Sequence, residues 1–180
     1  MKKIIILTSI FLTMSFWTMA QREGKTRFSI GPELGYATSN PLNSFPGNKG
    51  WGLGIGASAE VEHFFQESAS GIFYIGILSY KGRSSGTDLN GVNTNNKAYT
   101  VIPIRVGGNI YAGSRLHLGA QIGVGLNSRG GKGTTAFAYT PQIGYNFSKN
   151  DHPLDLTFKY DGYAGNGSFS ALGLRLSLIL

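Results

Sequence analysis

The chain has 180 residues, no cysteine and a formal net charge of +7. Without cysteine it has no disulfide framework, no thiol nucleophile and no lipid anchor carried by a cysteine. The basic charge does not indicate binding to nucleic acid, because no Lys/Arg-rich run, recognition-helix pattern or aromatic RNA-binding motif accompanies it.

The first twenty residues have the features of a secretory signal peptide. Two lysines precede a short apolar run, and a small-residue motif ends at Ala20. We therefore predict that residues 1–20 are a cleaved signal peptide and that residues 21–180 form a single domain. An uncleaved N-terminal anchor is the alternative, although the apolar run is short for a membrane-spanning helix.

Segments in which apolar residues alternate with polar or small ones recur along the rest of the chain. A period of two predicts β-strands with one apolar face and one polar face. Most of these segments have the length of a tilted membrane strand, and an even number of strands is typical of bacterial single-chain barrels. The segments are residues 28–37, 51–63, 71–81, 97–109, 115–127, 135–147, 153–163 and 169–180. The predicted fold is therefore all-β, an eight-stranded antiparallel up-and-down transmembrane β-barrel.

The second segment shows the alternation most clearly. Its apolar positions run from Trp51 to Val61, and the positions between and after them are glycine, serine and the glutamates Glu60 and Glu62. Three glycines on the polar face indicate a crowded interior rather than the solvated face of a soluble sandwich. Aromatic residues near the ends of the segments predict the interfacial girdles of a membrane barrel. They are Phe28, Tyr36, Trp51, Phe137, Phe147, Tyr160 and Phe169.

Long polar connections alternate with short ones in the N-terminal half of the chain. Residues 38–50 and 82–96 are long connections, whereas residues 64–70 and 110–114 are short ones. Outer-membrane barrels have long extracellular loops and short periplasmic turns, so both termini are expected on the periplasmic side. A protein partner is expected to bind, if at all, through loops 38–50 and 82–96.

The third and fourth segments contain a short motif, Tyr80-Lys81-Gly82, which is followed after a polar loop by a strand with Tyr99 and Pro103. This pattern resembles the PorT-like outer-membrane β-barrel family, which is common in Bacteroidetes. The resemblance implies a small barrel in the bacterial outer membrane. It implies no particular activity, because members of one fold family have varied roles.

The polar faces of the predicted strands collect charged and amide side chains. The interior of an eight-stranded barrel is just wide enough for side chains to fill it, so these groups are expected to pair with one another. A narrow cation-selective channel along the glycine-rich faces is the alternative. The predicted lumen network consists of Glu33, Glu60, Glu62, Arg105, His117, Gln121, Gln142, Asp155, Lys159, Asp161 and Arg175.

A second group of charged residues gathers on the predicted outer side of the barrel. Lipopolysaccharide phosphates would be suitable counter-ions for them, and a set of solvated loop charges is the alternative. The candidate lipopolysaccharide contacts are Lys49, Lys81, Arg83, Lys97, Arg129 and Lys132.

No motif in the sequence predicts catalysis, a cofactor or a metal site. His63, His117 and His152 lack metal-ligand spacing, and no motif places a hydroxyl nucleophile beside a histidine. The glycine-rich residues 130–134 lack the first glycine and the following helix of a phosphate-binding loop. We therefore expect neither an enzyme nor a cofactor-binding protein.

The sequence thus predicts a monomeric barrel of the bacterial outer membrane, in contact with lipid and lipopolysaccharide. Its expected role is that of a membrane-embedded scaffold or interaction module that acts through its extracellular loops. One alternative is a narrow channel or porin for small solutes. A second alternative is a soluble periplasmic barrel that binds lipid, with its apolar faces turned inward.

Overall fold

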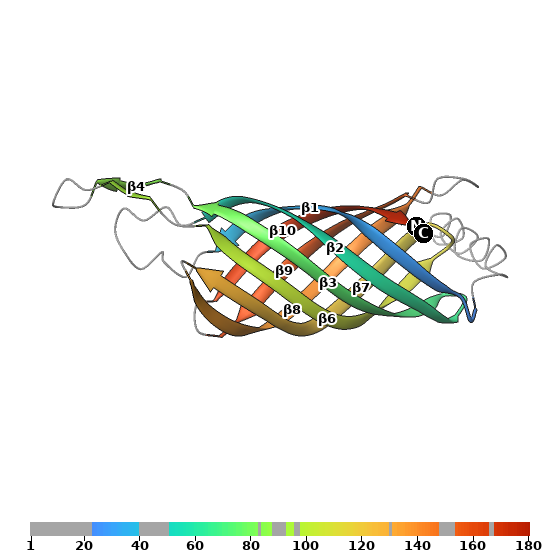
Figure 1. Ribbon diagram of the computed structural model, residues 1–180. Helices are drawn as coiled ribbons and strands as arrows, with labels where there is room; N and C mark the ends of the chain where they lie inside the picture. Colours follow the sequence, from blue (N-terminus) through green and yellow to red (C-terminus); the bar gives the residue numbers. More distant parts are fainter. Residues whose placement is uncertain are drawn as a thin grey trace, which may run out of the picture.

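The computed structural model describes residues 23–39, 51–82, 84–87, 93–95, 98–129, 131–147, 154–165 and 168–180. Within them, eight long strands form one closed barrel and two short strands form a separate hairpin (Figure 1). The barrel strands are β1 (Thr26–Ser39), β2 (Trp51–Gln66), β3 (Ala69–Gly82), β6 (Tyr99–Ala112), β7 (Leu116–Arg129), β8 (Lys132–Asn146), β9 (Leu154–Ala164) and β10 (Phe169–Ile179). The hairpin strands are β4 (Ser84–Thr87) and β5 (Asn93–Asn95).

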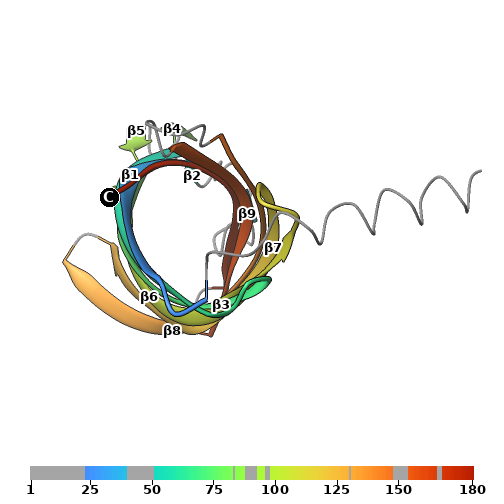
Figure 2. The same cartoon turned by 90° about the vertical axis from the view of Figure 1, so that its right-hand side faces the viewer.

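Each barrel strand pairs antiparallel with the next one along the chain, and β10 returns to pair with β1. The closing seam aligns Glu33 with Arg175. Figure 2 looks along the barrel and shows the strands closing into a ring, which removes free strand edges from the wall. The predicted eight-stranded antiparallel up-and-down barrel is therefore confirmed.

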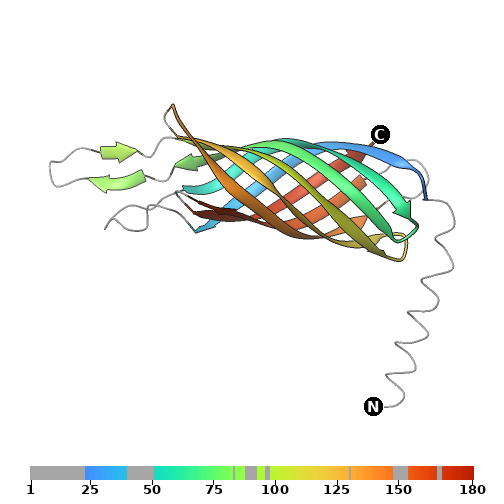
Figure 3. The same ribbon diagram turned by 90° about the horizontal axis from the view of Figure 1, so that it is seen from below.

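The two ends of the barrel differ. At one end, which we call the turn end, residues 67–68 connect β2 to β3, residues 113–115 connect β6 to β7, and the C-terminus lies nearby (Figure 1). The turn at residues 113–115 begins with Gly113 at a φ of 76°, a left-handed conformation that favours glycine. At the other end, which we call the loop end, the β4–β5 hairpin projects away from the barrel (Figures 1 and 3).

Two connections differ from the sequence predictions. The predicted connection over residues 64–70 is replaced by longer strands, because Phe64 and Ser70 pair across the ladder with both side chains buried. The predicted loop over residues 82–96 contains the β4–β5 hairpin. These short strands of serine, glycine, threonine and asparagine have no apolar face, so they give no alternation signal in the sequence.

The exterior of the barrel is apolar and its interior is polar. Ile55 and Ile110 expose 67% and 70% of their surface, whereas the inward-facing Glu33, Arg105 and Asp161 are at most 1% exposed. Soluble proteins usually show the opposite arrangement, with aliphatic residues inside and charged residues outside. Barrels that face lipid alternate apolar-out and polar-in along every strand, as this one does.

Three prolines interrupt the ladders of the barrel wall. Proline has no backbone N–H to donate, so it removes a ladder hydrogen bond wherever its nitrogen faces a neighbouring strand. Pairing between β1 and β10 skips Pro32, pairing between β3 and β6 skips Pro103, and pairing between β8 and β9 skips Pro141. Regular pairs resume on both sides of each gap, so the barrel stays closed.

Candidate functional site

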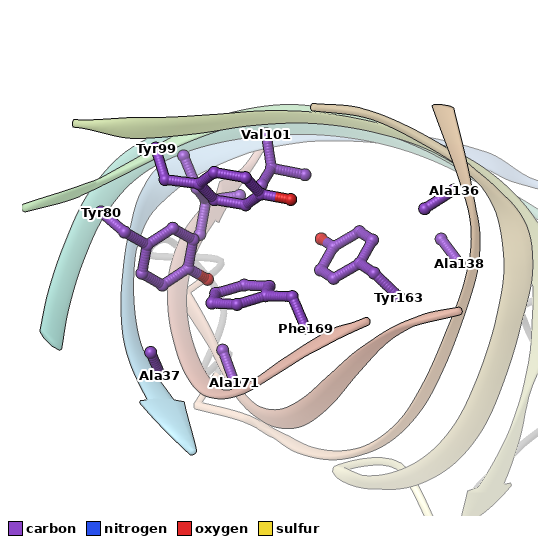
Figure 4. Packing of buried hydrophobic residues seen from close by; sticks show 10 residues of the cluster. Ala37, Tyr80, Tyr99, Val101, Ala136, Ala138, Tyr163, Phe169 and Ala171 are labelled. Carbon is purple, nitrogen blue, oxygen red and sulfur yellow. The ribbon is translucent and has the colours of Figure 1, made fainter. Parts of the chain in front are cut away.

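Aromatic rings fill the lumen at the loop end (Figure 4). The ring of Phe169 contacts those of Tyr80, Tyr99 and Tyr163, with centroid distances of 4.8, 5.2 and 5.8 Å. All four side chains are buried. Edge-on and tilted contacts of this kind stabilise an aromatic cluster beyond the effect of burial alone. We call these four residues the aromatic plug.

Glycines on the inner face make room for the aromatic plug. A Cβ atom at Gly54 would lie 2.6 Å from Cε1 of Tyr80, and a Cβ atom at Gly35 would lie 2.6 Å from the Tyr80 hydroxyl oxygen. Both distances are shorter than a van der Waals contact, so a larger residue at either position would displace the ring. Part of the glycine-rich inner face of β2 is therefore explained by the tyrosine that packs against it.

The sequence prediction for one girdle residue, Phe169, is wrong. This residue begins β10 with its side chain turned inward, so it is 1% exposed and belongs to the aromatic plug. Phe28, Tyr36 and Phe137 lie on the outer face with about half of their surface exposed, as does Phe147. The side chain of Trp51 lies outside the described part of the chain.

Two cations and two carboxylates form a compact group in the middle of the lumen. Lys159 Nζ lies 2.7 Å from a carboxylate oxygen of Glu33 and 3.6 Å from one of Asp161. The guanidinium of Arg105 donates to the carboxylate of Asp161. These four side chains are at most 2% exposed, and their formal charges balance. Buried ions persist when they are paired in this way.

Two neutral hydroxyl groups complete this group. Tyr74 donates to Glu33 at 2.7 Å, and its ring lies under the Arg105 guanidinium at 4.2 Å. Thr140 donates to Asp161 at 2.9 Å and also accepts a hydrogen bond from Arg105. We call these six residues, Glu33, Tyr74, Arg105, Thr140, Lys159 and Asp161, the central ion cluster. Tyr74 and Thr140 are not among the predicted lumen residues, although their positions on the inward faces of β3 and β8 follow from the alternation.

A second polar layer lies between the central ion cluster and the turn end. Arg175 donates from Nε to Ser58 Oγ at 2.8 Å and from Nη2 to Ser29 Oγ at 2.9 Å. Its guanidinium also lies 3.6 Å from Glu33 and 3.7 Å from Glu60. A chain of amides continues this layer, because Gln121 donates to Gln142 and Gln142 donates to Asn109, each at 3.0 Å.

Glu62 is the centre of the layer nearest the turn end. One of its carboxylate oxygens accepts hydrogen bonds from Ser70 Oγ at 2.6 Å, Asn109 Nδ2 at 3.0 Å and the Tyr111 hydroxyl at 2.5 Å. Asp155 lies in the same layer, where Thr157 donates to it at 2.7 Å. The Nδ1 atom of His117 lies 3.6 Å from the Asp155 carboxylate.

The structure places all of the predicted lumen residues on the inner face of the barrel. Ten of them are buried, and the side chain of the remaining one, Glu60, is 11% exposed. The face on which each of these residues lies follows from the alternation of its strand, whereas its partners depend on the register between strands. The aromatic plug, the central ion cluster and the polar layers together fill the lumen from the loop end to a small pocket at the turn end.

The candidate lipopolysaccharide contacts are only partly described. Lys81 is exposed near the loop end of β3. Arg129 and Lys132 end β7 and begin β8, where they pair across the ladder, but their side chains lie outside the described part of the chain. Lys49, Arg83 and Lys97 lie entirely outside the described residues.

The described residues contain no group of histidine and acidic side chains that could hold a metal ion. His63 is exposed near the turn end and pairs with Thr26 at 2.9 Å, whereas His117 faces the lumen and His152 lies outside the described residues. No helix in the described part of the chain is long and apolar enough to cross a membrane.

A closed eight-stranded meander with an aliphatic exterior and a lumen filled by paired charges defines a class of protein. It has the architecture of the small transmembrane β-barrels, in which lipid-facing and lumen-facing residues alternate. The fold and the filled lumen therefore assign the chain to this structural class.

The comparisons with known proteins agree with this class. No family model matches the chain, and no curated protein matches its sequence. Ail of Yersinia pestis, in complex with the heparin analogue sucrose octasulfate, is similar in fold, with a TM-score of 0.55 and 14% identity over 88% of this chain and 99% of Ail. The outer membrane protein OprG of Pseudomonas aeruginosa has a TM-score of 0.51 and 8% identity over 88% of this chain and 94% of OprG. A de novo designed transmembrane β-barrel has a TM-score of 0.51 and 14% identity over 89% of this chain and 98% of the design.

Proposed function

We propose that this chain is exported, loses residues 1–20, and inserts as a monomer into the bacterial outer membrane, where it acts as a scaffold or interaction module through its loop end. The filled lumen carries this proposal, because it leaves the two ends and the outer wall as the surfaces available for function. The aliphatic exterior and the similarity in fold to the outer membrane protein OprG support the location. Membership of the PorT-like family, which the motif from Tyr80 to Pro103 implies, is part of the same proposal. No catalytic role is included.

The loop end is proposed to face the cell exterior. The β4–β5 hairpin projects there, and at the same end of the barrel β1 ends at Ser39, β2 begins at Trp51 and β3 ends at Gly82. Periplasmic turns of outer-membrane barrels are short and extracellular loops are long, so the two-residue turn at residues 67–68 belongs on the periplasmic side. A soluble lipid-binding barrel is less consistent with this geometry, since its apolar faces would have to line a cavity rather than the exterior.

Anionic sugar phosphates of lipopolysaccharide are the proposed partners of the loop end. Lys81 is exposed there, and β7 and β8 bring Arg129 and Lys132 to the same end. Multiple cations bind a polyanion because each cation near a charged surface contributes about 1 kcal/mol at low ionic strength. Ail, which is similar in fold, was crystallised with a sulfated heparin analogue, so a small barrel of this shape is compatible with binding a polyanion.

Removing these charges should weaken binding to lipopolysaccharide. In the triple variant Lys81→Gln, Arg129→Gln and Lys132→Gln we expect binding to lipopolysaccharide vesicles to fall about 10- to 100-fold at low ionic strength. Co-sedimentation of the purified barrel with vesicles measures this loss. The matched control is Lys25→Gln with Arg115→Gln, which removes exposed charges at the turn end and should leave binding within about twofold. An equal loss in both variants would contradict a specific role of the loop end.

The proposal also predicts that the barrel does not conduct ions. The central ion cluster and the aromatic plug occupy the lumen in series, so an ion would have to displace paired, buried charges to pass. In planar lipid bilayers we expect no step-like current at protein concentrations at which a sixteen-stranded porin inserts and conducts. Reproducible unitary steps would instead favour the narrow channel.

A further inference from the structure

A small pocket opens into the lumen from the turn end. The centre of a water molecule can occupy a volume of about 20 Å³ in this pocket. Polar side chains from seven of the barrel strands line it. The second polar layer, the central ion cluster and the aromatic plug close the lumen beyond it. Among the described residues, the pocket is therefore closed towards the loop end and open towards the turn end.

Three carboxylates line this pocket, those of Glu60, Glu62 and Asp155. The carboxylate of Glu60 lies 3.7 Å from Nη1 of Arg175. Glu62 accepts its hydrogen bonds from neutral groups, and Asp155 lies 3.6 Å from the imidazole of His117. Arg27 lies opposite Glu62 in the β1–β2 ladder, so the preference for a positively charged guest rests on the excess of carboxylates over arginines in the lining.

Two guanidinium groups also line the pocket, and each has other contacts. Arg175 donates to Ser29 and Ser58. The guanidinium of Arg27 lies over the ring of Phe64 at 4.6 Å. Three carboxylates against two guanidinium groups leave the lining with a formal charge of −1 when His117 is neutral. The pocket thus keeps a net negative charge after both arginines are counted.

Ser177 provides an independent indication of a guest. It lines the pocket, it is 1% exposed, and its hydroxyl oxygen has no hydrogen-bond partner among the described residues. A buried hydroxyl without a hydrogen-bond partner costs free energy, and Ser177 is one of several buried polar groups in the described part of the barrel that lack one. A donor that enters the pocket would supply the missing partner.

We propose that this pocket binds the ammonium head of a slender primary amine. An alkylammonium head carries three N–H donors and no acceptor, so it complements the carboxylates of Glu62 and Asp155 together with the Ser177 hydroxyl. The head is about the size of a water molecule, which matches the volume of the pocket. The alkyl stem leaves through the turn end. A free alkylamine and a lysine side chain share this chemistry, and the inference requires only the closed barrel, whichever compartment the turn end faces.

Thermal unfolding of the full barrel in detergent micelles tests this proposal with n-butylammonium chloride as the probe. We expect n-butylammonium to raise the unfolding temperature by about 4 °C relative to the same concentration of tetramethylammonium chloride. Tetramethylammonium has the same charge but no N–H donor and a larger head. Ser177→Ala should reduce the shift by at least half, and Asp155→Asn should abolish it. Glu67→Gln removes a carboxylate at the turn end outside the pocket and should leave the shift unchanged.

Two further probes identify the source of the amine. Spermidine represents a free amine, and a tripeptide with blocked ends and a central lysine represents a protein side chain. A rise in the unfolding temperature with either probe supports the proposal and indicates whether the amine is a free molecule or a lysine side chain. Equal shifts with n-butylammonium and tetramethylammonium would overturn it, as would a full shift in Ser177→Ala. The pocket would then hold water only.

Discussion

Replacing Arg105 with methionine should destabilise the barrel by about 3–5 kcal/mol, because it leaves the carboxylate of Asp161 buried without its main cation. Both side chains are fully buried, so solvent cannot compensate for the lost charge. Methionine keeps an unbranched apolar chain similar to the arginine stem, so the loss mainly reports the charge rather than a cavity. Urea unfolding in lipid vesicles, followed by intrinsic fluorescence, measures the loss as a lower midpoint at unchanged slope.

A double-mutant cycle shows whether the ion pair is the cause. Asp161→Asn alone leaves Arg105 in excess and should also be strongly destabilising. In the double variant Arg105→Met with Asp161→Asn, Lys159 and Glu33 still balance each other. The double variant should therefore lose about 2 kcal/mol less stability than the sum of the losses in the two single variants. Additive losses would show that the two side chains do not act as a pair.

Arg115 provides the matched control for Arg105. The side chain of this exposed arginine at the turn end donates from Nη1 to the Tyr145 hydroxyl at 3.2 Å. Arg115→Met should change the free energy of unfolding by no more than about 0.5 kcal/mol. If Arg105→Met were equally mild, the lumen would have to be hydrated enough to solvate Asp161, and the case for a closed lumen would fail.

The central ion cluster joins strands that are distant in the sequence. Glu33 comes from β1, Tyr74 from β3, Arg105 from β6, and Lys159 with Asp161 from β9. Backbone ladders connect only neighbouring strands, so contacts across the lumen are the additional links that fix the barrel's cross-section. A wall with ladder gaps at three prolines benefits from such links. We infer that the lumen network maintains the cross-section of the barrel.

Much of this arrangement is predictable from the sequence because a strand has a period of two. Once residues 51–62 are read as a strand, Glu60 and Glu62 must share a face with the glycines, and the same argument places Arg105, His117 and Asp161 inside the barrel. The period gives the face of each residue without any knowledge of its neighbours.

The remaining features depend on register and on packing across the lumen. Alternation in β10 places Phe169 on the same inner face as Gly173 and Arg175, so its assignment to a girdle relied too much on its place at the strand end; its ring contacts with Tyr80 and Tyr163 depend on packing across the lumen. Tyr74 and Thr140 lie on predicted inner faces, but their roles follow from meeting Glu33 and Asp161 across the lumen. The unpartnered hydroxyl of Ser177 is a property of the folded barrel alone. Such contacts require the three-dimensional positions of strands far apart in the sequence.

Replacing Ile122 with arginine should destabilise the barrel by about 2–4 kcal/mol in a bilayer, since a cation on the outer wall near the membrane centre must leave water. Ile122 lies midway along β7 between Val106 and Tyr139 of the neighbouring strands, and 55% of its surface is exposed. Unfolding by urea in lipid vesicles measures the loss. In expressing cells, the same variant should show less heat-dependent gel mobility shift and weaker retention in carbonate-washed membranes.

The size of this loss of stability distinguishes a membrane barrel from a soluble one. On a water-exposed wall, Ile122→Arg would change stability by no more than about 0.5 kcal/mol, because an exposed surface substitution leaves no buried contact or unpaired charge. Thr135→Arg is the matched control, since Thr135 faces outward at the loop end of β8, where an arginine in a membrane barrel costs about 0–1 kcal/mol. A large loss of stability in Ile122→Arg together with a small loss in Thr135→Arg would show that the barrel is surrounded by an apolar layer that is centred near Ile122, as a bilayer is. Two equally small losses would require water there, and the aliphatic wall would then need a different explanation from lipid.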